Sequence, residues 1–237
     1  MITASTRLVA LLGHPVGHSL SPAMQNAAFA ARGLDWAYVA LDVPPGRLEE
    51  ALRGLAALGF AGANVTAPHK LVAARLVGAA VPSVNTLLVR DEGIEGASTD
   101  PAILRARRCE PRAPVILGDG GAAVAFAHAL PRARRYARRT EWPPDAAGAD
   151  LVVNATSARD DAVVEVGPGQ TLVDLPYPES ATARAARAAG ATVVGGLEVL
   201  VAQGAASFRL WTGVPAPVDV MRAAVGLPRD ADADDGG

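Results

Sequence analysis

Apolar and polar residues along the chain follow two patterns, one typical of strands and one typical of helices. Short apolar runs bounded by glycine or polar residues are typical of buried strands, and three occur early: 7–13 (RLVALLG), 36–43 (WAYVALDV) and 60–67 (FAGANVTA). Between them, one-sided apolar patterns predict two helices. The first is expected to be capped by Ser21, with Pro22 in its first turn and Gly33 at its end, and the second is amphipathic over 46–59.

The second half of the chain repeats this alternation. A hairpin is predicted over 83–96, and the strand and helix signals restart after about residue 104. The later strands and helices are predicted at 113–130, 150–156, 170–177, 180–190, 191–196, 197–213 and 217–225. Repeated β-α units favour an α/β fold with mainly parallel sheets.

The restart divides the chain into two expected lobes. One comprises residues 1–104 plus the C-terminal helices at 201–228, and the other comprises residues 105–200. The acidic end of the chain, 229–237, is expected to be a solvated tail. No run reaches the ~18 apolar residues of a membrane span. A net charge of −2 and few aromatic residues argue against a nucleic-acid partner.

Cysteine and histidine usage narrows the chemistry further. The single cysteine, Cys109, excludes an intramolecular disulfide and favours a reducing compartment, so we expect a cytoplasmic protein. The four histidines have no metal-ligand spacing, so no metal site is expected. The composition does not choose between a monomer and a homodimer.

Lys70 is the only lysine of the chain, and the other twenty-one of its 22 lysine and arginine residues are arginines. A lysine ammonium is compact and can release its proton, whereas a guanidinium is wide and stays charged. Asp100 is a candidate charge partner for Lys70 in proton transfer, although a helix cap is the simpler role for an aspartate before a helix. In HSLSP (18–22), Ser19 and Ser21 at a helix start could bind a small carboxylate, or Ser21 could simply cap the helix.

The stretch GDGGAA (118–123) follows a strand and opens a helix, as a dinucleotide-binding fingerprint does. Gly118 would make the turn and Gly120 would let the backbone approach a pyrophosphate, although Asp119 carries a charge that would repel it. About twenty residues on, Arg138 and Arg139 replace the acidic residue that reads a ribose hydroxyl, which favours NADP over NAD. The alternative is a solvated basic strand.

Six stretches of the chain together resemble, in order, the motifs of the shikimate dehydrogenase family. They are GHPVGHSLSPAMQNAAF, GANVTAPHK, SVNT, GASTD, VVNATS and GGLEVLVAQGAASFRLWTG. Ser98 and Asp119 depart from the family pattern. The span from Thr140 to Asp150 is shorter than in the family, which leaves little room for the usual helix of the cofactor lobe. The resemblance implies an N-terminal α/β substrate-binding lobe and a Rossmann-like NADP-binding lobe. It also implies catalytic roles for Lys70 and Asp100. The substrate-binding residues it implies are Ser19, Ser21, Asn64, Thr66, Asn85, Thr99, Tyr177 and Gln203. The cofactor-binding residues it implies, together with the glycine turn, are Gly118, Gly120, Gly121, Ala122, Arg138, Arg139, Asn154, Thr156 and Gly196.

The function expected from this resemblance is the reversible, NADPH-dependent reduction of 3-dehydroshikimate to shikimate, a step of aromatic amino-acid biosynthesis. The expected partners are therefore a small-molecule substrate and NADP. Two alternatives stay open at this point. One is an NAD-preferring quinate or shikimate dehydrogenase, and the other is a catalytically weak or inactive substrate-binding relative with a degenerate cofactor lobe.

Overall fold

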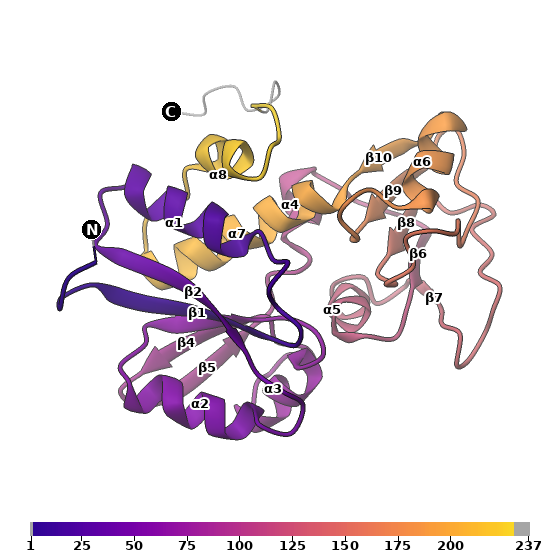
Figure 1. The fold of residues 1–237 in the computed structure, drawn as a ribbon. Helices are drawn as coiled ribbons and strands as arrows, with labels where there is room; N and C mark the ends of the chain where they lie inside the picture. Colours follow the sequence, from indigo (N-terminus) through magenta and orange to yellow (C-terminus); the bar gives the residue numbers. More distant parts are fainter. Residues whose placement is uncertain (1, 230–237) are drawn as a thin grey trace.

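The protein has two lobes, each built on its own five-stranded sheet (Figure 1). The computed structural model describes residues 2–229, so the tail expected at 229–237 lies outside the described residues apart from Arg229. The first sheet has the order β2-β1-β3-β4-β5 and the second has the order β10-β9-β8-β6-β7. The α/β class and the two lobes expected from the sequence are confirmed.

The first lobe holds a mixed sheet. β1 pairs in parallel with β2 and β3, whereas β3, β4 and β5 pair antiparallel. The β4–β5 pair is the hairpin that the sequence predicts. Its elements are β1 (Arg7–Gly13), α1 (Ser21–Ala31), β2 (Trp36–Asp42), α2 (Leu48–Ala57), β3 (Gly62–Val65), α3 (Lys70–Leu76), β4 (Thr86–Arg90) and β5 (Gly93–Ala97).

The second lobe holds a parallel sheet. Its elements are β6 (Pro114–Leu117), α5 (Gly121–Ala129), β7 (Arg134–Tyr136), β8 (Leu151–Asn154), β9 (Thr171–Asp174), α6 (Ala181–Ala188) and β10 (Thr192–Val194). Between β7 and β8 the chain crosses without a helix, as the short span from Thr140 to Asp150 predicts. That face of the sheet is covered instead by α6 and by buried side chains of the connecting segments, such as Ala146 and Val164.

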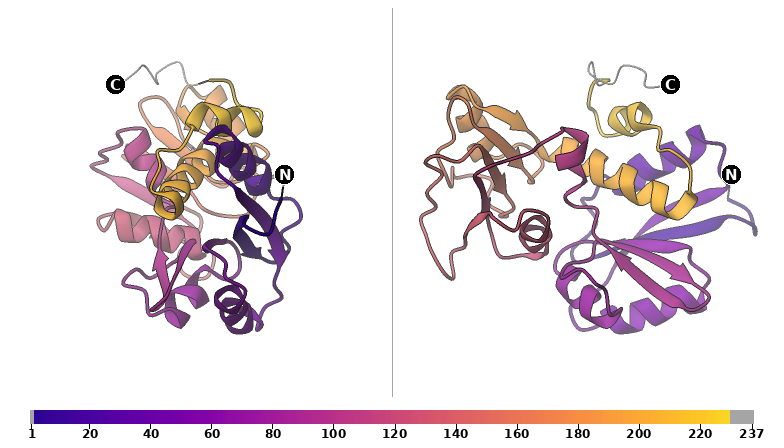
Figure 2. Two further views of the ribbon diagram at one scale, coloured as in Figure 1. Left: turned by 90° about the vertical axis from the view of Figure 1, so that its left-hand side faces the viewer. Right: turned by 180° about the vertical axis from the view of Figure 1, so that it is seen from behind.

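Two helices connect the lobes. α4 (Ala102–Ala106) leads into the second lobe, and α7 (Gly196–Thr212) returns from it to pack beside α1 and α8 (Val218–Ala224) (Figure 2). The apolar residues of α7 belong to both lobes: Val199 packs in the second core, whereas Phe208 and Trp211 pack in the first. Glu198 in the first turn of α7 pairs with Arg107 and Arg222, which fixes the helix start at the junction.

Two expectations about helix ends are wrong. Ser21 does not cap α1, because the cap position is Leu20 and Ser21 is already the first helical residue. The Ser19 hydroxyl instead accepts the free Ser21 N–H at 3.2 Å. Likewise, the cap position of α4 is Pro101, so the carboxylate of Asp100 is not used as a cap. Both side chains are therefore available for another role.

Candidate functional site

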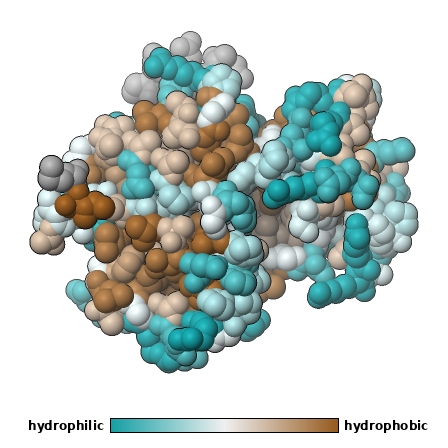
Figure 3. All heavy atoms as spheres, in the orientation of Figure 1, coloured by the Kyte–Doolittle hydropathy of each residue, from teal (hydrophilic) through white to brown (hydrophobic). Residues whose placement is uncertain are grey.

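The candidate site lies at the junction of the lobes, where the carboxyl ends of strands from both sheets meet. In α/β sheets, ligands bind at this edge because the loops there carry the side chains that face outward from the strand ends. The segments after β1, β3, β6, β8 and β9 all contribute to two cavities in this region. Figure 3 shows the hollow between the two lobes.

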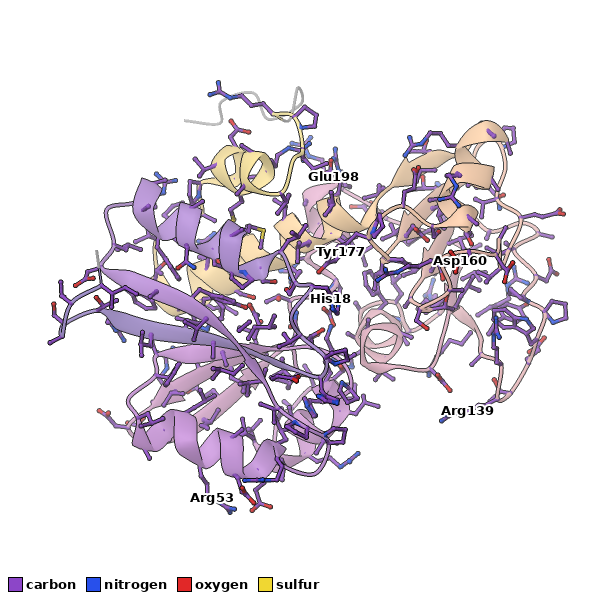
Figure 4. The ribbon with its side chains drawn as sticks, viewed as in Figure 1. His18, Arg53, Arg139, Asp160, Tyr177 and Glu198 are labelled. Carbon is purple, nitrogen blue, oxygen red and sulfur yellow. The ribbon has the colours of Figure 1, made fainter. Side chains whose placement is uncertain are left out.

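The first cavity has a volume of about 320 Å³ and lies mostly against the first lobe. It is lined by eight of the ten residues predicted to be catalytic or substrate-binding, namely Ser19, Ser21, Asn64, Thr66, Lys70, Asp100, Tyr177 and Gln203. His18 and Tyr177, which come from different lobes, both line this cavity (Figure 4). The cavity is large enough for a small ring compound with several hydroxyls.

Lys70 and Asp100 form a tight ion pair in the wall of this cavity. The Lys70 ammonium donates to both carboxylate oxygens of Asp100, each at 2.7 Å, and both side chains are mostly buried. Lys70 is the first residue of α3, directly after the loop that follows β3, whereas Asp100 follows β5. Such a charge-assisted contact orients the ammonium toward the cavity, where it can donate a proton to a reacting oxygen.

Asn85 and Thr99, the other two predicted substrate residues, lie behind the cavity wall. The Asn85 amide has three acceptors within 3.0 Å: Thr99 Oγ1, Asp100 Oδ1 and Gln203 Oε1. Its carbonyl oxygen accepts the Thr99 N–H at 2.6 Å. The structure therefore gives Asn85 a positioning contact with Asp100 and Gln203, and both Asn85 and Thr99 are buried.

Asn64 belongs to a buried polar network that sequence reasoning missed. Its amide donates to Ser207 Oγ at 3.0 Å and Thr86 Oγ1 at 3.2 Å, and its carbonyl oxygen accepts the Tyr38 hydroxyl at 2.9 Å. Burial raises the pKa of Tyr38, so its hydroxyl stays protonated and remains a donor. Thr86 follows Asn85 in SVNT and Ser207 lies one turn after Gln203, so these two had a signal in the sequence. Tyr38 had none.

Tyr177 adds a third hydroxyl to the carboxylate-binding position predicted from HSLSP. Ser19, Ser21 and Tyr177 are called the carboxylate seat below. Tyr177, in the loop after β9, is partly buried beside the Ser19 hydroxyl. Burial raises the pKa of Tyr177, although the Ser19 hydroxyl and the Leu20 N–H act in the opposite direction. The seat therefore offers three hydroxyl groups, from Ser19, Ser21 and Tyr177, which can all donate to an oxygen anion.

The second cavity, of about 490 Å³, lies between the lobes beside the N-terminus of α5. It is lined by Gly120, Gly121 and Ala122 of the glycine turn and by Thr156 after β8. Gly118 lies at φ +114°, and a Cβ there would lie 3.0 Å from the Ala155 carbonyl oxygen, so the turn requires glycine. A glycine turn, a helix N-terminus and a large cavity fit the pyrophosphate of a dinucleotide.

Four other predicted cofactor residues lie outside this cavity. Asn154 is fully buried and holds Thr156 through its Oδ1, which accepts the Thr156 hydroxyl at 2.7 Å. Gly196 lines the first cavity instead. Arg138 and Arg139 lie on the loop after β7. The Arg138 guanidinium lies 5.4 Å from the centre of the Trp142 ring, and the Arg139 guanidinium lies 3.7 Å from the Asp119 carboxylate (Figure 4).

Within residues 2–229 no cluster of three or more His, Cys, Asp or Glu side chains could hold a metal ion. No helix in that part of the chain is long and apolar enough to cross a membrane. Burial raises the pKa of the Cys109 thiol, which makes it a weaker nucleophile.

Known proteins match this architecture over nearly the whole chain. Residues 11–87 match the shikimate dehydrogenase substrate binding domain, and residues 196–225 match the shikimate 5'-dehydrogenase C-terminal domain. Shikimate dehydrogenase (NADP(+)) of Anaeromyxobacter dehalogenans is 43% identical, covering 94% of this chain and 97% of the relative. The enzyme of Moorella thermoacetica is also 43% identical, with 93% and 92% covered.

Solved structures agree with these relatives. A Thermus thermophilus shikimate 5-dehydrogenase in complex with NADP(H) and shikimate has a TM-score of 0.81 and 32% identity, covering 92% of this chain and 98% of that one. Shikimate dehydrogenase from Aquifex aeolicus has a TM-score of 0.85 at 28% identity, with 95% and 100% covered. The alignment with the Anaeromyxobacter dehalogenans enzyme spans 270 positions against 237 residues here, so that relative has at least 33 positions that this chain lacks. The chain belongs to the shikimate dehydrogenase family.

Proposed function

We propose that this protein catalyses the reversible, NADPH-dependent reduction of 3-dehydroshikimate to shikimate. It is an NADP-dependent oxidoreductase that acts on the CH-OH group of shikimate, and its relatives are named shikimate dehydrogenase (NADP(+)). The observation that carries this proposal is the position of the Lys70–Asp100 pair. Lys70 lines both the substrate-sized cavity and the cavity at the glycine turn, so its ammonium lies where the two ligands would meet.

The proton step is assigned to Lys70. When bound, NADPH supplies the hydride to the ketone carbon. The Lys70 ammonium donates a proton to the ketone oxygen as negative charge develops on it, and Asp100 keeps the ammonium oriented. Asn85 holds Asp100 through a contact of 3.0 Å, which fixes the pair relative to Gln203. In the reverse direction Lys70 accepts the proton from the shikimate hydroxyl.

Substrate binding is assigned to the polar lining of the first cavity. The hydroxyls of Ser19, Ser21 and Tyr177 would bind the carboxylate, whereas Asn64, Thr66 and Gln203 would contact ring hydroxyls. Asn85 and Thr99, predicted as substrate residues, are assigned supporting contacts behind Asp100. The need for a proton donor at this position then explains why a lysine stands at position 70 in a chain that otherwise uses arginine.

Cofactor binding is assigned to the second cavity. Gly118, Gly120, Gly121 and Ala122 form the pyrophosphate turn, and Thr156, held by Asn154, lies on the opposite wall. Arg138 and Arg139 are assigned to the 2′-phosphate, because both are exposed on the loop after the second strand of the lobe. Gly196 is assigned a place at the junction, near the reacting ends of both ligands.

The lobes are assigned separate tasks. Residues 1–104 with 201–228 form the substrate-binding domain, and residues 105–200 form the dinucleotide-binding domain. The single cysteine supports a location in a reducing compartment, and we place the enzyme in the cytoplasm.

The direct test is the fall in nicotinamide absorbance of NADPH when 3-dehydroshikimate is added. We expect turnover that Lys70→Ala abolishes while the variant still binds shikimate in a calorimetric titration. Turnover with NADH at equal or higher kcat/KM would favour an NAD-preferring enzyme. Shikimate binding without turnover or cofactor binding would favour a substrate-binding relative.

A further inference from the structure

Arg159 is a cation in the cofactor cavity that has no role in the assignments above. It lies in the loop after β8 and lines the same cavity as Gly120, Gly121 and Thr156. Two basic side chains line this cavity, Lys70 and Arg159. The charge of Lys70 is balanced by Asp100 at 2.7 Å, so the uncompensated positive charge in the cavity wall is that of Arg159.

The loop holds Arg159 in place by its backbone while leaving its side chain free. The Arg159 carbonyl oxygen accepts the Ala181 N–H at 2.7 Å, which ties the loop to the start of α6. Its guanidinium makes no hydrogen bond or ion pair with any residue between 2 and 229. The side chain is exposed. A positioned backbone with a free guanidinium is suited to an anionic ligand that arrives from solution.

The positive charge of Arg159 affects Tyr177 at the junction of the two cavities. Burial raises the pKa of Tyr177, and Arg159 is among the groups that oppose this rise. Tyr177 and Arg159 share the neighbourhood of Leu175, which lines both cavities. Arg159 therefore belongs to the lining of the cofactor cavity on the side where that cavity meets the first one.

The charge balance at the glycine turn also favours a cation from this side. A pyrophosphate carries two negative charges, while the N-terminus of α5 provides only about half a positive charge. Asp119 in the turn adds a negative charge, which Arg139 offsets at 3.7 Å. The exposed Asp160 and Asp161 follow Arg159 in the chain, but unlike Arg159 neither of them lines the cavity.

We propose that Arg159 is a cofactor-binding residue that contacts the dinucleotide pyrophosphate from the β8 side, opposite the N-terminus of α5. This inference rests on the proposed binding of NADPH. A guanidinium can donate two parallel hydrogen bonds to phosphate oxygens, and such contacts are among the strongest in proteins. Removing them is expected to weaken cofactor binding by about 10- to 100-fold.

The two cofactors distinguish this contact from one with the 2′-phosphate. NADPH and NADH both carry the pyrophosphate, but only NADPH carries the 2′-phosphate. Arg159→Ala should therefore raise the Kd of both cofactors by the same factor, whereas Arg138→Ala should raise that of NADPH alone. Arg159→Lys should recover part of the affinity, because it keeps the charge but loses the paired donors. The binding of shikimate without cofactor should not change.

Arg112→Ala is the matched control, because it removes the same charge from an exposed position of the same lobe. Arg112 lies just before β6, at the opposite end of the parallel strands from the cavity. The Kd values for NADPH and NADH should be unchanged in this variant. Thermal midpoints of all variants should match that of the wild type, since both arginines are exposed.

Three results would overturn the role of Arg159 while leaving NADPH binding intact. These are an unchanged Kd for both cofactors in Arg159→Ala, a weakening confined to NADPH, or a weakening confined to shikimate. The second result would assign Arg159 to the 2′-phosphate and the third to the substrate carboxylate. A wild-type protein that binds neither cofactor would instead overturn the proposed function itself.

Discussion

Gly121 of the second lobe lies directly against Lys70 of the first. A Cβ at position 121 would lie 2.6 Å from Lys70 Cβ and 3.1 Å from Lys70 Cδ. Because the position of the Lys70 Cβ is fixed by the backbone of α3, a change of side-chain rotamer cannot move it away from a Cβ at position 121. The glycine turn and the catalytic lysine thus share one contact, and the spacing between the lobes at this point depends on the missing side chain.

The first prediction concerns this contact. Gly121→Ala should push Lys70 or the second lobe out of position and lower kcat by about 10- to 100-fold, since misplacements near 1 Å can cost that much. Shikimate binding without cofactor should change less. Gly120→Ala is the control, because a Cβ there meets no neighbouring atom of residues 2–229 within 4 Å and acts on cofactor approach alone. Equal kcat in Gly121→Ala and wild type, measured at saturating NADPH, would show that the contact is not critical.

The second prediction concerns the identity of the proton donor. Lys70→Arg keeps the positive charge beside Asp100 but replaces a compact ammonium with a wide guanidinium that does not release its proton. We expect kcat to fall by roughly 10²–10⁴, with a smaller change in the Kd of shikimate. Steady-state kinetics and calorimetry separate the two quantities. A near-native kcat would contradict the reason given for the single lysine.

The third prediction concerns the two serines of the carboxylate seat. Ser19→Ala should raise KM for shikimate by about tenfold or more, because a hydrogen bond to a charged group is lost. Ser21→Ala should raise KM and also lower the thermal midpoint, because the buried Ser21 hydroxyl contacts Tyr38. Ser98→Ala serves as a control, since its buried hydroxyl has no hydrogen-bond partner within residues 2–229. Unchanged KM in both seat variants would contradict the carboxylate assignment.

The fourth prediction concerns cofactor preference. NADPH should bind at least tenfold tighter than NADH, because one charge-assisted contact from arginine to a phosphate is worth roughly 1.5–3 kcal/mol. Replacing Arg138 and Arg139 together by alanine should remove most of this difference. Calorimetric titration of both cofactors against wild type and the double variant measures it. Similar affinities for NADPH and NADH in the wild type would move the protein toward relatives that use both.

The fifth prediction concerns Asp174, which supports Asn154 through a contact of 2.7 Å. Burial raises the pKa of Asp174, although hydrogen bonds from Ser180 and Asn154 oppose the rise. A carboxyl with a raised pKa favours the fold when protonated, so its contribution to stability falls as pH rises through that pKa. Asp174→Asn should therefore gain stability relative to wild type as pH rises above the ordinary carboxyl pKa of about 4.

Asp150 provides the control of opposite sign for this measurement. Burial acts to raise its pKa, but the N–H groups of Arg112 and Ala113 outweigh burial and lower it. Asp150→Asn should therefore lose stability relative to wild type as pH rises toward the ordinary carboxyl pKa of about 4, and the loss should persist at higher pH. Thermal midpoints at several pH values measure both variants. A stability difference for Asp174→Asn that does not vary with pH would contradict the argument.

The local patterns of the sequence determined most of the architecture. Apolar runs, glycine stops and the restart near residue 104 are sufficient for the order of strands and helices, because each depends on neighbouring residues only. The missing helix between Thr140 and Asp150 was anticipated by the resemblance to the family and not by these patterns. Lys70 was conspicuous in the sequence because every other long basic side chain is arginine.

The roles of individual polar side chains were decided by the tertiary structure. From the sequence, Asp100 and Ser21 each had a helix cap as a simpler role, and only the packing of α3 against the β5 end brought Asp100 to Lys70. Tyr38 and Arg159 lie in unremarkable stretches, yet one supports Asn64 and the other lines the cofactor cavity. Such contacts join residues far apart in the chain, so they depend on strand register and on how the two lobes meet, which no local pattern encodes.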